Sequence, residues 1–261
     1  MAKIIAIANQ KGGVGKTTTA INLAAALAAH HQSVLLMDMD PQGNATMGSG
    51  VDKAHLVHSS NDVLLRDCLA EQACLSTALG FALIPANGDL TVAEVSLMDQ
   101  SHRETVLFKA LQPLHSRYDY VLIDCPPSLN TLTLNALVAA DSVLVPLQCE
   151  YYALEGLAAL LSTVEQVRGS VNPRLRLEGV LRTLYDGRNR LCVDVSAQLV
   201  EHFPHQVYQA LVPRNVRLAE APSHGMSIIH YDPSSTGAAA YMALAAEFLQ
   251  RQTVSTEQGY A

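Results

Sequence analysis

A glycine-rich segment near the start of the chain, residues 12–18 (GGVGKTT), constrains the fold more than any other part of the sequence. It follows a short apolar stretch, residues 3–8, that is typical of a buried strand, and it opens a helix-like stretch, residues 16–31. Glycines in such a loop let backbone N–H groups turn inward on phosphate groups. The sequence therefore predicts a phosphate-binding loop between the first strand and the first helix.

Strand-like and helix-like segments alternate along almost the whole chain. Apolar runs that predict strands lie at residues 3–8, 33–37, 81–85, 120–123, 142–147, 177–184 and 207–212. Helix-like segments lie at residues 16–31, 152–168, 194–202 and 235–251. This alternation predicts βαβ units, so we expect an α/β fold with a doubly wound, mostly parallel sheet and helices on both faces. The lack of Trp agrees, because the core must then come from Leu, Ala, Val and Ile.

The chain shows no internal repeat and no linker, so we expect a single domain, residues 1–252, and a flexible C-terminal tail, residues 253–261. The longest apolar stretch, residues 21–29, is about half as long as a membrane span, and no signal peptide is recognisable. We therefore expect a cytoplasmic protein that does not enter a membrane. The cysteines have no CxxC spacing and are expected to be reduced thiols: Cys68, Cys74, Cys125, Cys149 and Cys192.

Within the loop, Lys16 is expected to reach the β- and γ-phosphates of a nucleotide, and the Thr17 hydroxyl to bind Mg²⁺. The strict pattern G-x-x-x-x-G-K-[ST] would need a glycine where this chain has Gln10, so the loop is a variant that begins with Lys11. The expected phosphate-contacting residues are Gly12, Gly13, Val14, Gly15, Lys16, Thr17 and Thr18.

Carboxylates follow two of the predicted strands. Asp124 ends the run YVLID, where a carboxylate could hold the Mg²⁺ shell through water, because ligands of open parallel sheets bind at the carboxyl ends of strands. Asp38 and Asp40 end the second strand in MDMDPQGN. With the period of two that strands have, both would point to the same side and could face the phosphates. One of them is then a candidate for orienting the attacking water.

Five segments together resemble the ParA (Soj) chromosome- and plasmid-partition ATPases, a family with a deviant Walker A loop: KGGVGKTT, MDMDPQGNAT, DYVLIDCPPSLN, QCEYYALEGL and VPRNVRLAEAPSHG. The resemblance covers residues 3–249 and is least distinctive over residues 51–117. It implies that the chain binds ATP and Mg²⁺ and hydrolyses ATP.

The resemblance also implies roles for individual residues. Lys11 corresponds to the signature lysine of the family, which reaches the nucleotide of a partner subunit and stabilises phosphate charge. Lys16 corresponds to the Walker lysine, Asp40 to the carboxylate needed for hydrolysis and Asp124 to the Walker B position. These four residues are the expected catalytic set.

By the same resemblance, Pro213 and Asn215 lie in the segment that contacts adenine. ATP binding is expected to drive formation of a homodimer that binds DNA without sequence preference and associates with the nucleoid. Arg188 and Arg217 fall where relatives carry arginines that contact DNA, which requires positive charge but no base readout. A ParB-like centromere-binding partner is expected to stimulate hydrolysis and release the dimer.

Some features of this chain depart from the family pattern. Ser234 and Thr236 are uncharged in a loop where relatives often carry basic residues, and the net charge is −7. Fewer phosphate contacts predict weaker DNA binding and a flatter salt dependence. His224 is expected to be a structural residue rather than a catalytic base.

Other interpretations remain open from the sequence. An orphan ParA-like ATPase that positions a protein cargo would have the same biochemistry. A membrane-associated relative similar to MinD would need a basic amphipathic helix, whereas the last helix-like segment has Arg251 as its one base. A reductase resembling nitrogenase iron protein would need cluster-binding cysteines at a suitable spacing. A module that binds ATP without hydrolysing it would not need both Asp40 and Asp124.

Overall fold

The computed structural model describes residues 1–258, with side chains described up to residue 253. Within that range the strands form one eight-stranded sheet in the order β3-β4-β2-β5-β1-β6-β7-β8. The strands are β1 (Lys3–Ile7), β2 (Val34–Asp38), β3 (Leu75–Ser76), β4 (Ala82–Ile84), β5 (Tyr120–Asp124), β6 (Ser142–Gln148), β7 (Arg176–Tyr185) and β8 (Val207–Pro213). All neighbouring strands are parallel except β3 and β4. The predicted doubly wound, mostly parallel α/β fold is confirmed.

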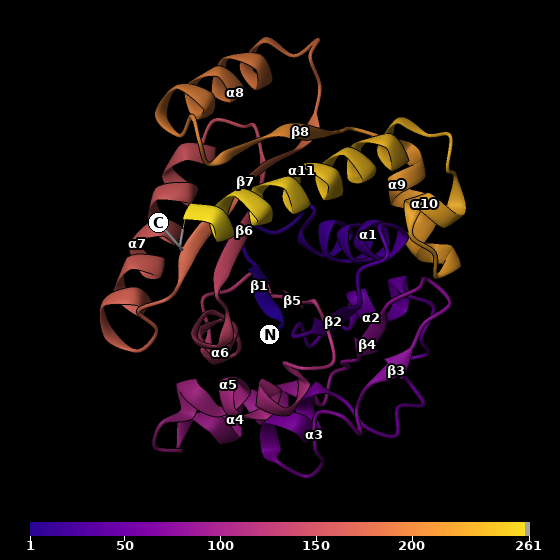
Figure 1. Ribbon diagram of the computed structural model, residues 1–261, viewed down its shortest axis with the longest axis vertical. Helices are drawn as coiled ribbons and strands as arrows, with labels where there is room; N and C mark the ends of the chain where they lie inside the picture. Colours follow the sequence, from indigo (N-terminus) through magenta and orange to yellow (C-terminus); the bar gives the residue numbers. More distant parts are fainter. Residues whose placement is uncertain (259–261) are drawn as a thin grey trace.

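Helices cover both faces of the sheet (Figure 1). They are α1 (Lys16–Ala29), α2 (Asn44–Gly48), α3 (Ser60–Leu65), α4 (Leu90–Met98), α5 (Val106–Leu111), α6 (Thr131–Ala139), α7 (Ala153–Ser170), α8 (Arg190–His202), α9 (Val216–Glu220), α10 (Ile228–Tyr231) and α11 (Thr236–Gln258). Helices α1, α10 and α11 pack on one face, and α3 to α8 pack on the other.

The sequence of β1 shows why two cores form. Ile4 and Ala6 face one core, whereas Ile5 and Ile7 face the other, because side chains alternate along a strand. All four side chains are essentially inaccessible to solvent. A strand that is apolar at every position can be buried on both faces, which explains why the unbroken apolar runs predicted a parallel sheet.

The predicted strands and helices are all present, with differences at their ends. Helix α8 begins at Arg190, earlier than expected, because the Asn189 side chain accepts a hydrogen bond from the Cys192 amide and caps the first turn. Helix α11 continues through Gln258, past the boundary predicted at residue 252, since no Gly or Pro interrupts the chain between residues 238 and 258. The rest of the predicted tail, residues 259–261, lies outside the described residues. The division into one domain and a tail stays a prediction.

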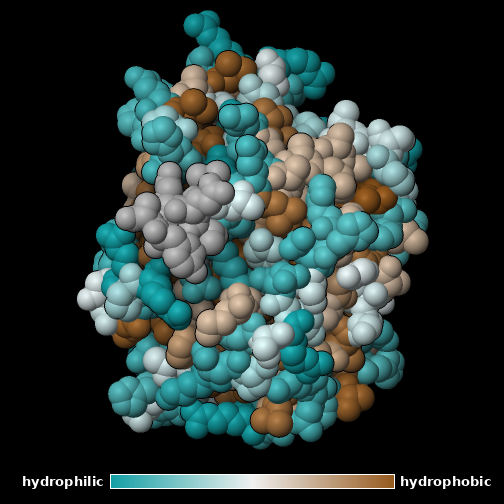
Figure 2. All heavy atoms as spheres, viewed as in Figure 1, coloured by the Kyte–Doolittle hydropathy of each residue, from teal (hydrophilic) through white to brown (hydrophobic). Residues whose placement is uncertain are grey.

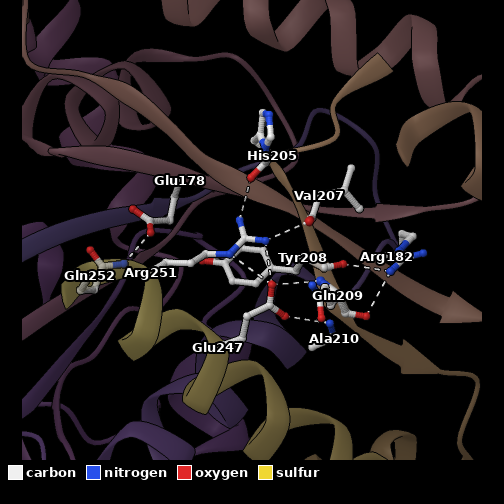
Figure 3. A network of polar contacts seen from close by, with 10 residues as sticks. All are labelled: Glu178, Arg182, His205, Val207, Tyr208, Gln209, Ala210, Glu247, Arg251 and Gln252. Atoms are coloured by element: carbon white, nitrogen blue, oxygen red, sulfur yellow. Dashed lines mark hydrogen bonds and ion pairs between the residues drawn. The ribbon is translucent and has the colours of Figure 1, made fainter. Parts of the chain in front are cut away.

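The last strand, β8, carries a bulge that side chains stabilise (Figure 3). Its register advances from Val207 to Leu211 while β7 advances only from Val180 to Arg182, so the backbone of residues 208–210 leaves the ladder. The Arg182 guanidinium donates to the carbonyl oxygens of residues 208 and 209, at 2.9 and 3.1 Å. The Glu247 carboxylate accepts from the amides of residues 209 and 210, at 3.0 and 2.8 Å. Side chains from β7 and α11 thus replace the missing strand partner.

Arg251 completes this cluster from the next turn of α11. Its guanidinium lies 4.0 Å from the ring centroid of Tyr208, pairs with Glu247 at 2.7 Å and donates to the Val207 carbonyl at 2.9 Å. Helix α11 is therefore tied to the edge of the sheet by polar contacts as well as by its apolar face.

Figure 2 shows hydrophobic residues interspersed with hydrophilic ones over the coloured part of the face that α11 crosses. Among residues 1–258, no helix combines the length and the apolar character needed to cross a membrane.

Glu247→Ala is expected to lower the free energy of unfolding by about 2 kcal/mol, because two amides of the bulge lose their acceptor. Urea denaturation measures this change. Glu165→Ala is the matched control. Glu165 pairs with Arg168 on the solvent-exposed side of α7, so its loss is expected to lower the free energy of unfolding by less than about 0.5 kcal/mol. Equal effects of the two substitutions would contradict the role given to Glu247.

Candidate active site

The phosphate loop connects β1 to α1, as the sequence predicted. Gly13 and Gly15 have φ angles of 73° and 85°, a left-handed conformation that only glycine adopts without strain. The loop is fixed at its start by Asn9, whose side chain accepts from the Lys11 amide at 3.0 Å and donates to the Pro146 carbonyl of β6 at 2.8 Å. The N-terminal turn of α1 then points its free amides at the space beside the loop.

A cavity of about 400 Å³ opens beside this loop, at the carboxyl ends of the parallel strands. Its lining residues are Gly12, Gly13, Gly15, Lys16, Thr17, Thr18, Asp40, Gln42, Asn44, Pro127, Thr183, Leu184, Val212, Pro213, Asn215, Leu218, Ala219 and Tyr241. The loop contributes polar groups to this lining, and β8 and α9 contribute apolar side chains. A nucleotide needs this combination, because its phosphates require donors and its base requires apolar walls.

The Lys16 side chain is largely buried where it lines the cavity and donates to the Lys11 carbonyl at 3.1 Å. Burial lowers its pKa, and the nearby carboxylate of Asp124 opposes that change. Lys16 thus lies where an incoming phosphate would complete its coordination.

Asp124 ends β5, between Ile7 of β1 and Asp38 of β2 in the strand register. It is fully buried, and neither carboxylate oxygen has a hydrogen-bond partner among the described residues. Burial raises the pKa of Asp124 well above its ordinary value, and the charge of Asp38 raises it further. The Thr17 hydroxyl and the Lys16 ammonium lie close enough to oppose that rise without satisfying the carboxylate.

An unpaired buried carboxylate next to a threonine hydroxyl fits the requirements of Mg²⁺. This ion prefers oxygen ligands and keeps several of its waters, so one protein hydroxyl, nucleotide oxygens and a water held by Asp124 would suffice. Within the described part of the chain there is no cluster of three or more Asp, Glu, His or Cys side chains that could hold a metal alone. The side chains at this site would therefore supply only part of the coordination of a metal, with nucleotide oxygens and waters as the other ligands.

The expectation that Asp38 and Asp40 both face the phosphates is wrong for Asp38. Its carboxylate points into the protein and accepts from the Asp40 amide at 3.1 Å and from the Thr46 amide and hydroxyl at 2.8 and 2.7 Å. Burial raises its pKa to about 6, although these hydrogen bonds oppose the rise. The prediction assumed that side chains alternate between the two faces of the sheet as far as Asp40. Because β2 ends at Asp38, Asp40 lies in the following turn, where this alternation does not apply. Asp38 instead anchors the turn that brings Asp40 to the cavity.

Lys11 does not line the cavity of its own chain. Its ammonium pairs with the carboxylate of Glu150, just after β6, and both side chains are a little under half exposed. Glu150 lies in the segment QCEYYALEGL, but nothing in its spacing indicated this contact. The lysine is therefore directed outward, on the surface next to the phosphate loop.

Pro213 and Asn215 line the cavity near its apolar wall. Asn215 also caps α9 by accepting from the Leu218 amide at 3.2 Å, and its amide donates to the Thr236 hydroxyl at 2.9 Å. This double anchoring fixes the segment that the resemblance connects with adenine.

The two arginines expected at a DNA surface lie outside the cavity. Arg188 is exposed and makes a two-pronged contact with Asp186, at 2.9 Å for both nitrogens. Arg217 is half exposed and pairs with Glu220 at 2.8 Å and with Asp232 at 3.6 Å. Neither arginine is buried in a way that would prevent contact with a phosphate backbone.

The remaining residues singled out in the sequence, namely His224, Val14 and the cysteines, do not line the cavity. His224 is also absent from the cavity lining and stacks on Tyr231, with ring centroids 4.9 Å apart. Val14 is the one residue of the segment 12–18 that does not line the cavity, and its side chain is buried in the protein. The described cysteines are all free thiols.

A strand, a glycine loop and a helix around a polar cavity, with a buried carboxylate on the neighbouring strand, define a P-loop nucleotide-binding protein. A family model described as an AAA domain matches residues 2–177. The chain is 51% identical to the chromosome partitioning protein ParA of Myxococcus xanthus, over 97% of this chain and 90% of that protein. It is also 51% identical to the sporulation initiation inhibitor protein Soj of Bacillus subtilis, over 95% of this chain and 98% of that protein. The chain belongs to the ParA/Soj family of P-loop ATPases.

Solved structures agree with this assignment of the fold. The chain is similar to a Mycobacterium smegmatis protein described as cobyrinic acid a,c-diamide synthase, whose structure contains ADP and magnesium. The two are 40% identical, the match covers 97% of this chain and 96% of the other, and the TM-score is 0.85. The same protein with a bound ATP analogue and magnesium gives the same agreement.

Asp124→Asn is expected to stabilise the nucleotide-free protein by about 1–2 kcal/mol at pH 8, because it removes an unpaired buried charge. Since the folded state holds the Asp124 proton more tightly than the unfolded chain, this carboxyl group contributes stability at low pH that is lost as the pH rises through its raised pKa. The gain should therefore be larger at pH 8 than at pH 5. Thermal unfolding with and without Mg²⁺ and nucleotide measures it, and the variant should lose the Mg²⁺-dependent part of nucleotide affinity.

Glu178→Gln is the matched control for this experiment. Burial alone would raise the pKa of Glu178, but Lys3 and hydrogen bonds from Ser142 and Gln252 hold it below its ordinary value. Removing this satisfied carboxylate should destabilise the protein at neutral pH. If Asp124→Asn destabilises the nucleotide-free protein as well, Asp124 has a partner and the account of the site is wrong.

Proposed function

We propose that this protein is a partition ATPase. It binds ATP with Mg²⁺, forms a homodimer in that state and binds DNA without sequence preference, and a ParB-like partner stimulates hydrolysis and releases it. Such a protein acts in the cytoplasm, associated with the nucleoid. The observation that carries the proposal is the combination of a phosphate-binding loop that lines a cavity with a lysine, Lys11, that lies outside this cavity.

The residues of the cavity, together with the buried Asp124, support ATP hydrolysis. Thr17 and Asp124 would hold Mg²⁺, which supplies positive charge that stabilises the transferring phosphoryl group. Lys16 would bind the β- and γ-phosphates, and Asp40, held by the turn that Asp38 anchors, would orient the attacking water.

The position of Lys11 supports a nucleotide-dependent dimer. Its ammonium group is exposed beside the cavity and can reach the nucleotide of a second chain once its ion pair with Glu150 opens. An exposed pair of this kind contributes little, so opening it costs about 1 kcal/mol or less. A phosphate of ATP in the partner subunit would offer Lys11 a stronger, charge-assisted contact. Hydrolysis would weaken that contact and return the chains to the monomeric state.

DNA binding through Arg188 and Arg217 follows from exposed positive charge. Each arginine is paired with carboxylates at the surface, and such pairs can exchange a carboxylate for a DNA phosphate at small cost. The loop around Ser234 and Thr236 adds no positive charge, and the chain carries a net charge of −7. We therefore propose weak binding by each chain that becomes useful when a dimer presents two sets of contacts.

Binding to nonspecific duplex DNA, measured across a salt series with ATP and with ADP, tests this proposal. The wild-type protein should bind with ATP and not with ADP, and the affinity should fall as salt rises. Arg217→Ala should weaken binding and reduce the slope of log K against log salt by about 0.9 for each DNA phosphate that the variant no longer neutralises. Arg168→Ala, which removes an exposed arginine paired with Glu165 on α7, is the control and should have little effect. Absence of binding in every nucleotide state would contradict the DNA-transport function and leave the nucleotide site intact.

A further inference from the structure

The end of β7 touches the phosphate loop, although β7 is two strands away from β1 in the sheet. The hydroxyl of Thr183 donates to the carbonyl oxygen of Val14 at 2.7 Å. Both residues are almost completely buried, at 2% and 1% exposure. The Thr183 methyl also lies 3.9 Å from the point where a Cβ on Gly15 would stand. A buried hydrogen bond and a van der Waals contact thus join this strand to the centre of the loop.

The hydrogen bond to the Val14 carbonyl also sets the direction of the Gly15 amide, which bears on phosphate binding. The peptide between Val14 and Gly15 is planar, so its carbonyl and its N–H point in opposite directions. Thr183 holds the carbonyl on the protein side, whereas Gly15 lines the cavity. The Gly15 amide is therefore directed toward the space where phosphates bind. Without this hydrogen bond, a peptide that is followed by the conformationally free Gly15 could rotate and turn the amide away.

We propose that Thr183 is a positioning residue for the phosphate loop. It acts through the Val14–Gly15 peptide: although Thr183 also borders the cavity, its hydroxyl donates to the Val14 carbonyl. The inference concerns nucleotide binding alone, so it goes beyond the proposed partition function and does not depend on DNA or on a partner protein.

The residue after Thr183 supports a functional role for this strand end. Leu184 has a φ angle of 50°, a left-handed conformation that is strained for a large side chain, and it lines the same cavity. The next carbonyl, that of Tyr185, accepts from the Arg214 amide at 3.0 Å beside Pro213. Strained backbone of this kind persists where the surrounding contacts fix it, and it concentrates at functional sites. The end of β7 thus connects the phosphate loop with the wall expected to hold the base.

The test compares the affinities of Thr183 variants for ADP and ATP in the presence of Mg²⁺, by titration calorimetry. Thr183→Val keeps the size and branching of the side chain and removes the donor, and it should weaken binding of both nucleotides about tenfold. Thr183→Ser keeps the hydroxyl and should remain within about threefold of the wild type. Thr183→Ala removes the donor without adding a methyl, so it gives a second measurement if the valine crowds the loop.

Thr77→Val is the matched control. The Thr77 hydroxyl donates to the Phe81 carbonyl at 2.6 Å and accepts from the Leu79 amide at 3.3 Å, and it does not line the cavity, so this variant loses hydrogen bonds away from the nucleotide. Both valine variants should lower the melting temperature of the nucleotide-free protein, but only Thr183→Val should lose affinity. The proposal is overturned if Thr183→Val and Thr183→Ala bind nucleotides as the wild type does. It is also overturned if Thr183→Ser is as weak as Thr183→Val, or if Thr77→Val weakens binding equally.

Discussion

A buried carboxylate without a hydrogen-bond partner among the described residues is the feature on which the rest of the site depends. Asp124 lies at the centre of the sheet, where the register of three parallel strands brings Ile7, Asp38 and Asp124 together. The carboxylates of Asp38 and Asp124, at the ends of two neighbouring inner strands, repel each other, and the charge of Lys16 partly compensates. Part of the negative charge of these carboxylates therefore stays uncompensated, and a metal ion bound with a nucleotide would neutralise it. Binding energy at such a site is coupled to stability, because the ligand-free state carries the cost of the unpaired charge.

The loops around this centre are held by contacts from several strands. A hydrogen bond from Asn9 holds the start of the phosphate loop to β6, and a hydrogen bond from Thr183 of β7 holds its middle. Asp38 accepts a hydrogen bond from the turn that carries Asp40. Preorganised amides and charges are effective because they require little rearrangement when the ligand arrives. Lys11 differs from these residues, since its ion pair with Glu150 is half exposed and can open. The site thus combines hydrogen-bonded contacts in its interior with one partly exposed ion pair at the surface, which suits the nucleotide-dependent dimer proposed above.

The sequence predicted the phosphate loop, the parallel sheet and the main helices, because glycine spacing and apolar periodicity report local structure directly. It failed for Asp38, where alternation was extended beyond the end of β2. It did not reveal the short helices α3 to α5, which lie within residues 51–117, the least distinctive part of the sequence. Glu150 and Thr183 were also missed: each acts on a residue more than one hundred positions away, so only the three-dimensional arrangement brings them to the loop. The extension of α11 could have been predicted from the sequence, because residues 238–258 contain no Gly or Pro.

The central claim is that one nucleotide site is completed by a second chain, and subunit mixing tests it most directly. Lys11→Ala and Asp40→Ala chains should each be inactive in ATP hydrolysis. In a mixed dimer, the chain with Lys11→Ala keeps its own Asp40 and receives Lys11 from its partner, so one site of two is complete. Random mixing should then restore activity to at most about one quarter of the wild-type value, because about half of the dimers are mixed. If the mixture is as inactive as the separate variants, Lys11 acts within its own chain and the account of a shared site is contradicted.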